Sequence, residues 1–189
     1  QAIRAFETSL ELLNLDYVDL YLIHWPVRGG RGDSWRALET LYEEGKCKAI
    51  GVSNYMVQHL EELLAGARIE PAVNQIEMHP FIYEERAPVV ELCRKRGICV
   101  ACYSPLTKGI RLADRGLQNI ATRYGRSPAQ LLIRWGLQKG FVTIPKSSRI
   151  ARIEENASVF DFEITGDDIV LMDGLNEGYS CTWNPADAP

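Results

Sequence analysis

The sequence lacks the features that define several broad classes of protein. No apolar run approaches the roughly 18 residues that a membrane-spanning helix needs, and no signal-peptide pattern is present. The net charge is −4 and the isoelectric point is near 5.5, whereas proteins that bind nucleic acid or anionic membranes are usually basic. We therefore expect neither nucleic acid nor a membrane as the main partner.

The cysteines are odd in number and scattered along the chain, with no regular spacing. The five cysteines are Cys47, Cys93, Cys99, Cys102 and Cys181. Cys99 and Cys102 form a C-x-x-C inside a stretch typical of a strand, where residues three apart point to opposite faces and cannot easily share a metal or a disulfide. We expect small buried hydrophobic side chains, no metal site, and a reducing, cytoplasmic location.

A glycine-rich dinucleotide fingerprint is also missing. The only glycine-rich stretch, "RGGRGD" (28–33), lacks the final glycine of G-x-G-x-x-G and follows a tryptophan-proline pair. This absence argues against a Rossmann sheet.

What the sequence does contain is an alternation of short apolar runs and amphipathic stretches. The runs predict strands at 17–24, 47–54, 72–79, 99–105 and 141–146. The amphipathic stretches predict helices near 4–14, 33–45, 55–66, 85–96, 113–124, 127–139, 148–158 and 166–175. In the first strand we expect Leu20, Leu22 and Ile23 to be buried. The alternation predicts parallel strands with right-handed crossovers, in an open doubly wound sheet or a closed barrel. No linker interrupts it, so we expect one domain over 1–189.

Helix start and stop signals support these boundaries. Ser127 followed by Gln130 predicts a capping box, and Thr165 before two aspartates predicts another helix start. Gly45 and Gly97 stand where a helix should end before the next strand.

Polar residues gather where the predicted strands end. They are His24 and Trp25, Ser53 and Asn54, Gln75 through His79, Tyr103 and Ser104, and Lys146 and Ser147. In a parallel (β/α) barrel these ends meet on one face, where active sites are built. The alternative is that strand ends are simply more polar than strand middles.

The segment "PKSSRIARIEEN" (145–156) predicts an anion site. A strand ends at Lys146, serines follow, and a helix then begins, so free backbone N–H groups and the helix dipole face a ligand. Arg152, Glu155 and Asn156 share one face of that helix. A solvated helix of mixed charge is the alternative.

The motifs "YVDLYLIHWP", "KAIGVSNY", "VNQIEMHP", "YSPL" and "IPKSSRIARIEEN", in this order, resemble those of the aldo-keto reductase family. The similarity runs from Gln1 to about Asn176. It implies a (β/α)8 TIM-type barrel that uses NADPH/NADP+, without a Rossmann fold, to reduce small aldehydes and ketones.

The resemblance also implies roles for individual residues in cofactor binding. Ser53, Asn54 and Gln75 would hold the nicotinamide carboxamide, and Tyr103 would stack on the nicotinamide ring, unless it is a core aromatic. Lys146, Ser147 and Arg152 would hold the adenosine 2′-phosphate, Glu155 and Asn156 would meet the adenine, and Ser104 and Leu106 would follow the pyrophosphate. Because NAD lacks a 2′-phosphate, we expect NADPH to be preferred.

The resemblance also assigns the substrate side of the site. His24 would orient the carbonyl oxygen and Trp25 would form part of the pocket wall, although His24 could instead be a histidine buried for packing. His59 and His79 are expected to be structural. Which carbonyl compound is reduced stays open.

The other catalytic residues of the family do not match this sequence. The family protonates the alkoxide with a tyrosine aided by a lysine and an aspartate, and no lysine and no matching tyrosine precede His24. About five of eight strands are counted, so we expect an incomplete barrel, the C-terminal portion of an aldo-keto reductase that is a monomer at full length. We expect little or no turnover from this chain alone.

Two other interpretations remain. One is a non-catalytic NADP(H)-binding regulatory or interaction protein of the same fold, as the potassium-channel β-subunits are. The other is a flavodoxin-like domain that needs only five strands, although it does not account for "IPKSSRIARIEEN".

Overall fold

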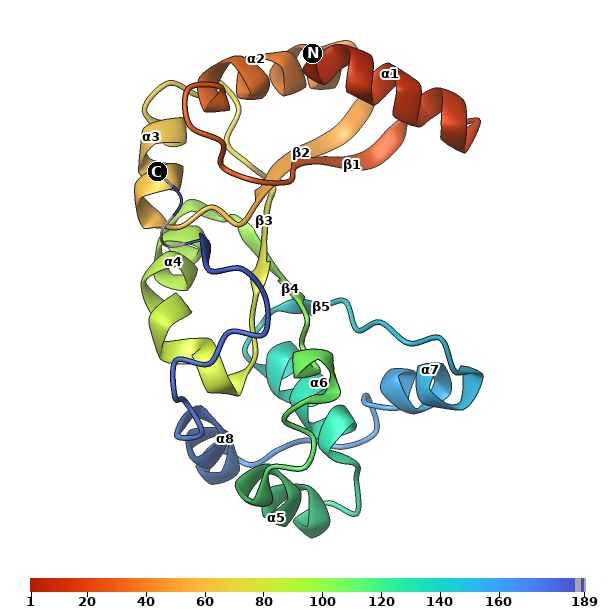
Figure 1. Cartoon of the computed structure of the whole chain (residues 1–189), viewed down its shortest axis with the longest axis vertical. Coiled ribbons are helices and arrows are strands. Elements are labelled where there is room, and N and C mark those ends of the chain that lie inside the picture. Colours follow the sequence, from red (N-terminus) through yellow and green to blue (C-terminus); the bar gives the residue numbers. More distant parts are fainter. Residues whose placement is uncertain (186–187, 189) are drawn as a thin grey trace. The chain divides into compact units, whose positions relative to one another are not determined.

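A computed structural model describes residues 1–185 and 188 of the chain (Figure 1). The backbone divides into two compact units. The first contains residues 1–75 and 92–99 and the end of the chain from 184, and the second contains residues 76–91 and 100–183. The expectation of a single domain over 1–189 stays a prediction.

The five predicted strands are present and parallel. In the described part of the chain they follow the order β1-β2-β3-β4-β5. Their bounds are Val18–Ile23 (β1), Cys47–Ser53 (β2), Val73–Glu77 (β3), Cys99–Tyr103 (β4) and Val142–Thr143 (β5). The predicted ranges contain all five, although β5 is only two residues long. Strands β3 and β4 each run from the first unit into the second.

The first unit packs helices α1 (Ala2–Leu13), α2 (Arg31–Glu43) and α3 (Val57–Leu64) with β1, β2 and the start of β3. Backbone approach is very close at Gly51 in β2. A Cβ atom added there would lie 2.5 Å from the carbonyl oxygen of Val73 and 2.8 Å from Cδ2 of Leu22. Only glycine therefore fits between these neighbouring strands without a shift.

Strand β1 differs from its prediction. Leu20 is 39% exposed, and Leu22 and Ile23 are only half-buried, so the expected full burial was wrong. The physical reason is that β1 lies at one edge of the sheet, and β2 is its one strand neighbour among the described residues. An edge strand keeps the apolar composition of a buried one while one side of it stays open.

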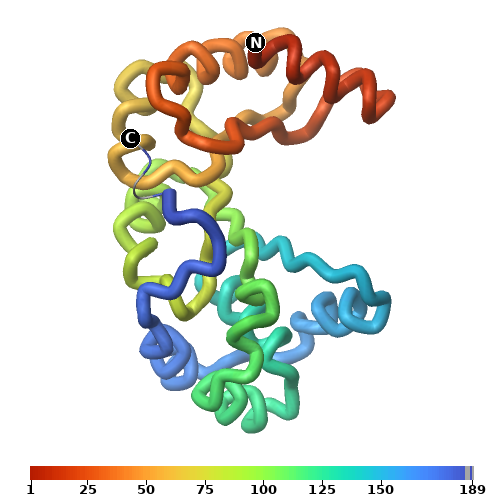
Figure 2. The backbone as a smooth tube through the Cα atoms, in the orientation of Figure 1, coloured from red at the N-terminus to blue at the C-terminus, as the bar shows by residue number. Residues whose placement is uncertain are grey.

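The second unit contains the remaining elements. They are the short 3₁₀ helices η1 (Pro80–Ile82) and η2 (Thr107–Gly109), and the helices α4 (Tyr83–Arg96), α5 (Arg115–Arg123), α6 (Pro128–Gln138), α7 (Ile150–Ala157) and α8 (Gly166–Asp173). The last turns of α4 belong to the first unit. Trp135 of α6 is buried, and its Nε1 donates to Asp173 of α8 at 2.8 Å. The C-terminal segment, blue in Figure 2, returns to η1, where the N–H of Tyr179 donates to the Phe81 carbonyl at 2.9 Å.

The predicted helix signals are confirmed. Ser127 and Gln130 form a reciprocal capping box, and the Thr165 side chain accepts a hydrogen bond from the N–H of Asp168. Gly45 and Gly97 have φ values of 72° and 69°, in the left-handed region that glycine reaches without strain.

The cysteines match their prediction in part. Among the described residues all five are free, and Cys99 is exposed where Cys102 is buried, as expected for opposite faces of a strand. The expectation that all are buried was wrong for Cys99, at the start of β4, and for Cys181, which is half-buried in the C-terminal segment. Over residues 1–185 and 188, no helix is both long and apolar enough to cross a membrane.

Candidate functional site

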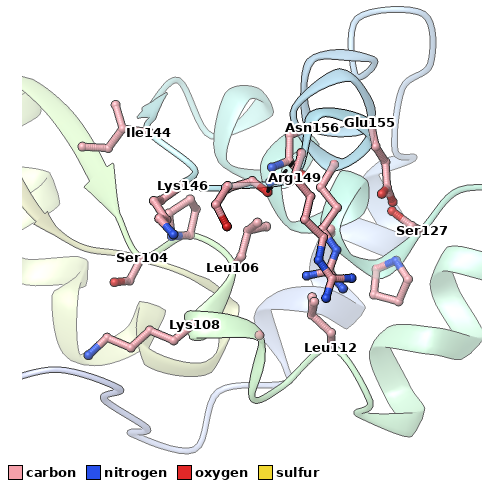
Figure 3. Close-up of a pocket in the computed structure, with 17 residues that line it drawn as sticks. Ser104, Leu106, Lys108, Leu112, Ser127, Ile144, Lys146, Arg149, Glu155 and Asn156 are labelled. Carbon is pink, nitrogen blue, oxygen red and sulfur yellow. Dashed lines mark hydrogen bonds between the residues drawn. The ribbon is translucent and has the colours of Figure 1, made fainter.

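A cavity of about 520 Å³ lies in the second unit (Figure 3). Its walls come from the loop after β4, the start of α6, the segment after β5, and α7. Seven of the residues predicted to bind a cofactor line it, namely Ser104, Leu106, Lys146, Ser147, Arg152, Glu155 and Asn156. Residues predicted from separate motifs are thus brought together, although their roles stay predictions.

The cavity is basic on an acidic protein. Its described lining includes four cationic side chains, those of Lys108, Lys146, Arg149 and Arg152, and one carboxylate, that of Glu155. The chain as a whole carries a net charge of −4. Such a local excess of positive charge attracts an anionic ligand to this wall of the second unit.

The segment from Ser147 to Arg149 lines the cavity where helix α7 begins. Arg149 is the N-cap of α7, and its N–H donates to Oγ of Ser147 at 3.2 Å. No acidic residue stands in the first turn of α7, so nothing there neutralises the positive end of the helix dipole. No side chain of helix α7 is buried, as is typical of a solvated helix. Arg152, Glu155 and Asn156 nevertheless line the cavity.

The loop after β4 is held in a tight, unusual conformation. Ser104, Thr107 and Lys108 have φ values of 50°, 51° and 52°, all in the left-handed region. Thr107 is fully buried; its hydroxyl donates to the carbonyl of Leu106 at 2.7 Å and accepts from the N–H of Arg111 at 3.1 Å. This geometry places Ser104 and Leu106 on the cavity wall. Neither Thr107 nor the N-cap Arg149 was assigned a role from the sequence.

Tyr103, the last residue of β4, does not line the cavity. The side chain is half-buried, and its hydroxyl lies 3.2 Å from Oγ1 of Thr182. Burial raises the pKa of Tyr103 above its ordinary value of 10.0. Burial therefore favours the neutral form of this phenol.

In the first unit, three predicted strand ends gather in one network. Oγ of Ser53 donates to the carbonyl of Gln75 at 2.8 Å, and Nδ2 of Asn54 donates to the carbonyl of His24 at 3.0 Å. Asn54 has a φ of 65°, directly after β2. Ser53 and Asn54 are buried, whereas His24 is exposed and Trp25 is half-buried. The alternative of a histidine buried for packing is thus wrong for His24.

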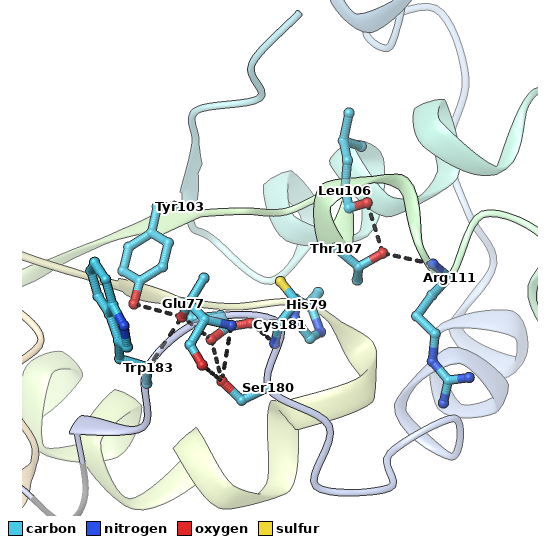
Figure 4. Close-up of polar contacts among 10 residues, drawn as sticks. Glu77, His79, Tyr103, Leu106, Thr107, Arg111, Ser180, Cys181 and Trp183 are labelled. Carbon is cyan, nitrogen blue, oxygen red and sulfur yellow. Dashed lines mark hydrogen bonds and ion pairs between the residues drawn. The ribbon is translucent and has the colours of Figure 1, made fainter.

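A buried carboxylate that sequence reasoning passed over lies at the end of β3 (Figure 4). Glu77 accepts hydrogen bonds from the N–H of Cys181 at 2.7 Å and from the hydroxyls of Ser180 at 2.6 Å and Thr182 at 2.5 Å. Nε2 of the buried His79 lies 3.1 Å from Oε1 of the same carboxylate. Burial by itself raises the pKa of Glu77, but these hydrogen bonds outweigh it and hold that pKa well below its ordinary value of 4.5.

The other two histidines have structural contacts, as expected. His79 bonds Glu77, and Nδ1 of His59 accepts from the N–H of Met56 at the start of α3, at 3.1 Å. The signal that could have pointed to Glu77 is its position, because a glutamate two residues after Gln75 on a strand shares the face of that residue.

Comparison with known proteins places this geometry in a family. The family model for the aldo/keto reductase family matches residues 1–177. The fold agrees with that of the crystal structure of Gox0644 in its apo form, with a TM-score of 0.92, 38% sequence identity, and coverage of 97% of this chain and 68% of that one. The structure of a Gox0644 mutant in complex with NADPH gives a TM-score of 0.91 at 39% identity, over 100% of this chain and 70% of that one.

Curated relatives agree. The chain is 52% identical over 177 residues to the uncharacterized oxidoreductase YtbE of Bacillus subtilis, and 50% identical over 181 residues to the glyoxal reductase of the same organism. These matches cover 94% and 96% of this chain but only 62% and 65% of the relatives, so the chain spans less than two thirds of their length.

The chain belongs to the aldo/keto reductase family. Its five parallel strands form part of the (β/α)8 barrel of that family, which confirms the predicted fold class. The flavodoxin-like interpretation is therefore wrong.

Proposed function

We propose that the protein to which this chain belongs reduces small aldehydes or ketones to alcohols with NADPH, and that the second unit binds the adenosine 2′-phosphate end of the cofactor. The observation that carries the proposal is the basic cavity of the second unit. It combines four cationic side chains, serine hydroxyls and the start of a helix in one wall.

The donor set of the cavity suits a 2′-phosphate better than a neutral ligand. We assign Lys146, Ser147 and Arg152 to the phosphate, with Arg149 as an additional cation, because a phosphate dianion needs several charged donors. Glu155 and Asn156, on the same helix, offer acceptor and amide groups to the adenine. Ser104 and Leu106 would follow the pyrophosphate. NAD(H) has no 2′-phosphate and would leave these cations without a partner.

For the nicotinamide end of the cofactor and for the substrate, the support is the family resemblance. We assign Tyr103 to stacking on the nicotinamide ring and Ser53, Asn54 and Gln75 to its carboxamide. When it is bound, NADPH supplies the hydride. The exposed imidazole of His24 would donate a hydrogen bond to the carbonyl oxygen of the substrate, and Trp25 would form an apolar wall.

Carbonyl reduction also needs a proton for the alkoxide. The family takes it from a tyrosine assisted by a lysine and an aspartate, and no lysine stands before His24 in this sequence. We therefore propose that the 189-residue polypeptide, assayed by itself, binds NADPH but turns over little or no substrate. Loss of a general acid typically costs about 10²–10⁴ in rate.

Two variants of the basic cavity test the cofactor assignment. Lys146→Met and Arg152→Leu should each weaken NADPH binding about 10-fold or more, since each removes a charged hydrogen bond worth about 1.5–3 kcal/mol, and should change NADH binding less than about twofold. Arg115→Leu is the matched control, because Arg115 is exposed and lies outside the cavity lining. Binding is followed by cofactor fluorescence. Equal losses for NADPH and NADH would refute the 2′-phosphate assignment.

A turnover assay tests the remaining part of the proposal. NADPH oxidation is measured with glyoxal, methylglyoxal and a short aliphatic aldehyde. Binding without turnover is the expected result for this polypeptide. Rapid aldehyde reduction by it would contradict the proposal that the proton donor is missing.

A further inference from the structure

We propose that Glu77 is a positioning residue for Tyr103, and that it acts through Thr182. In this arrangement the C-terminal segment carries a hydroxyl that fixes the side chain proposed to stack on the nicotinamide. The inference rests on the proposed function and adds to it a residue that lies outside the cavity.

The carboxylate of Glu77 is surrounded by hydrogen-bond donors. The Glu77 side chain is fully buried, and a carboxylate can only accept hydrogen bonds. Three donors come from one short stretch, Ser180 to Thr182, at 2.5 to 2.7 Å. Such short bonds to a buried anion are strong. The stretch 180–182 is therefore held firmly against the end of β3.

The Thr182 hydroxyl lies between the Tyr103 hydroxyl and the Glu77 carboxylate. The Thr182 hydroxyl has a single proton. Its oxygen lies 2.5 Å from Oε2 of Glu77 and 3.4 Å from the carbonyl of Trp183, so the proton points to the carboxylate. The Thr182 oxygen can then only accept from the Tyr103 hydroxyl, 3.2 Å away. The relay thus runs from Tyr103 through Thr182 to Glu77.

Glu77 and Tyr103 stand at the ends of two neighbouring strands. Glu77 ends β3 and Tyr103 ends β4, and within the second unit the N–H of Met78 donates to the Tyr103 carbonyl at 3.4 Å. Figure 4 shows the Tyr103 ring with its hydroxyl directed toward the Glu77 cluster and with Trp183 beside it. The sheet fixes the backbone of Tyr103, and the relay fixes the hydroxyl end of its ring.

The rest of the C-terminal segment supports the same function. The N–H groups of Glu177 and Tyr179 both donate to the Phe81 carbonyl, at 3.2 and 2.9 Å. Oδ1 of Asn176 accepts from the N–H of Glu84 at 3.1 Å. These contacts hold residues 176–179 against η1 and the start of α4. The chain then continues to Thr182, which lies beside Tyr103.

A metal ion is the other ligand that this cluster could suggest. Each of Glu77, His79 and Cys181 offers one atom that could bind a metal, and these three atoms lie within 4.8 Å of one another. Both carboxylate oxygens, however, already accept hydrogen bonds from N–H and O–H groups. Burial and the neighbouring Glu77 also raise the pKa of the Cys181 thiol to about 12, which disfavours the thiolate that a metal would need. The hydrogen-bonded relay accounts for the cluster without an ion.

Two ligands separate a positioning role from a merely structural one. NADPH contains the nicotinamide, whereas adenosine 2′,5′-bisphosphate contains the adenine and the 2′-phosphate but no nicotinamide. Thr182→Val removes the relay hydroxyl at nearly constant volume. We expect it to weaken NADPH binding about 3–10-fold, the range of an aromatic stacking interaction, and to change bisphosphate binding less than about twofold. Glu77→Gln should act in the same direction.

Two further variants serve as controls. Thr122→Val makes the same change at an exposed position of α5, where the hydroxyl donates to the Gln118 carbonyl at 2.8 Å and lies outside the cavity lining, and it should leave the ratio of the two affinities unchanged. Thr182→Ser keeps the hydroxyl and should retain the wild-type ratio. If Glu77→Gln does not fold, as judged by its thermal transition, Thr182→Val and Thr182→Ser decide the question.

The outcomes are distinct. Parallel losses for both ligands in Thr182→Val, or an equal change of the ratio in Thr122→Val, would overturn the positioning role. If the wild type binds the bisphosphate as tightly as NADPH, no stacking exists to be positioned, and the inference fails while the phosphate site stands. If the wild type binds neither ligand, the proposed function fails and this inference with it.

Discussion

The backbone N–H of Cys181 donates a hydrogen bond of 2.7 Å to Oε1 of Glu77, so one buried carboxylate holds together positions that are 104 residues apart. Because hydrogen bonds hold the pKa of Glu77 below its ordinary value of 4.5, the anion contributes stability that is complete above about pH 4.5. That contribution is lost as the pH falls from 4.5 toward the lower pKa of the folded state.

Glu77→Gln should therefore lower the free energy of unfolding by about 1.5–3 kcal/mol at neutral pH. The difference from wild type should shrink as the pH is lowered from about 5 to about 3. Urea unfolding over this pH range measures it. Glu70→Gln is the control: Glu70 is a half-exposed partner of Arg96 at 3.1 Å, and its loss should cost about 0–1 kcal/mol. A difference for Glu77→Gln that does not vary with pH would contradict the assignment.

The close approach at Gly51 makes a separate prediction about the first unit. Gly51→Ala places a Cβ 2.5 Å from the carbonyl oxygen of Val73, and backbone cannot move aside as a flexible side chain can. We expect the free energy of unfolding to fall by about 1–3 kcal/mol. Gly66→Ala is the matched control, because a Cβ there meets nothing within 4 Å, and its effect should stay within about 0.5 kcal/mol. Equal stabilities for the two variants would show that the strands relax at no cost.

The five cysteines should differ widely in reactivity toward a thiol reagent. Cys99 is exposed, whereas burial raises the pKa of Cys93 to about 11, and burial and the neighbouring Glu77 raise that of Cys181 to about 12. Only the thiolate reacts, so Cys99 should be modified first at neutral pH. Mass spectrometry of partly labelled protein identifies the site. Cys99→Ser should lose the fast phase, and a fast phase that survives in that variant would contradict the prediction.

Much of the fold could be predicted because the local signals agree with one another. Apolar runs gave all five strands within their predicted ranges, and the capping box at Ser127 and Gln130 fixed the start of α6. The burial of β1 could not be predicted, because composition does not tell an edge strand from a central one. Leu20 looks as apolar as a core residue and is 39% exposed.

The part of the candidate site that one continuous segment forms could be predicted. "PKSSRIARIEEN" placed Lys146, Ser147, Arg152, Glu155 and Asn156 at one cavity, since a strand end and a helix start meet there. The Glu77 cluster was missed because its donors come from Ser180 to Thr182, far away in the sequence. Thr107 was missed because its side chain acts on the backbone of its own loop.

The most direct test of the account is a titration of the unmodified 189-residue chain with NADPH and with NADH, followed by cofactor fluorescence. The basic cavity predicts saturable binding of NADPH that is at least about 10-fold tighter than that of NADH, and that weakens as salt is raised because the exposed cations are screened. Equal affinity for the two cofactors, or no binding by a folded chain, would contradict the claim that this cavity holds the 2′-phosphate.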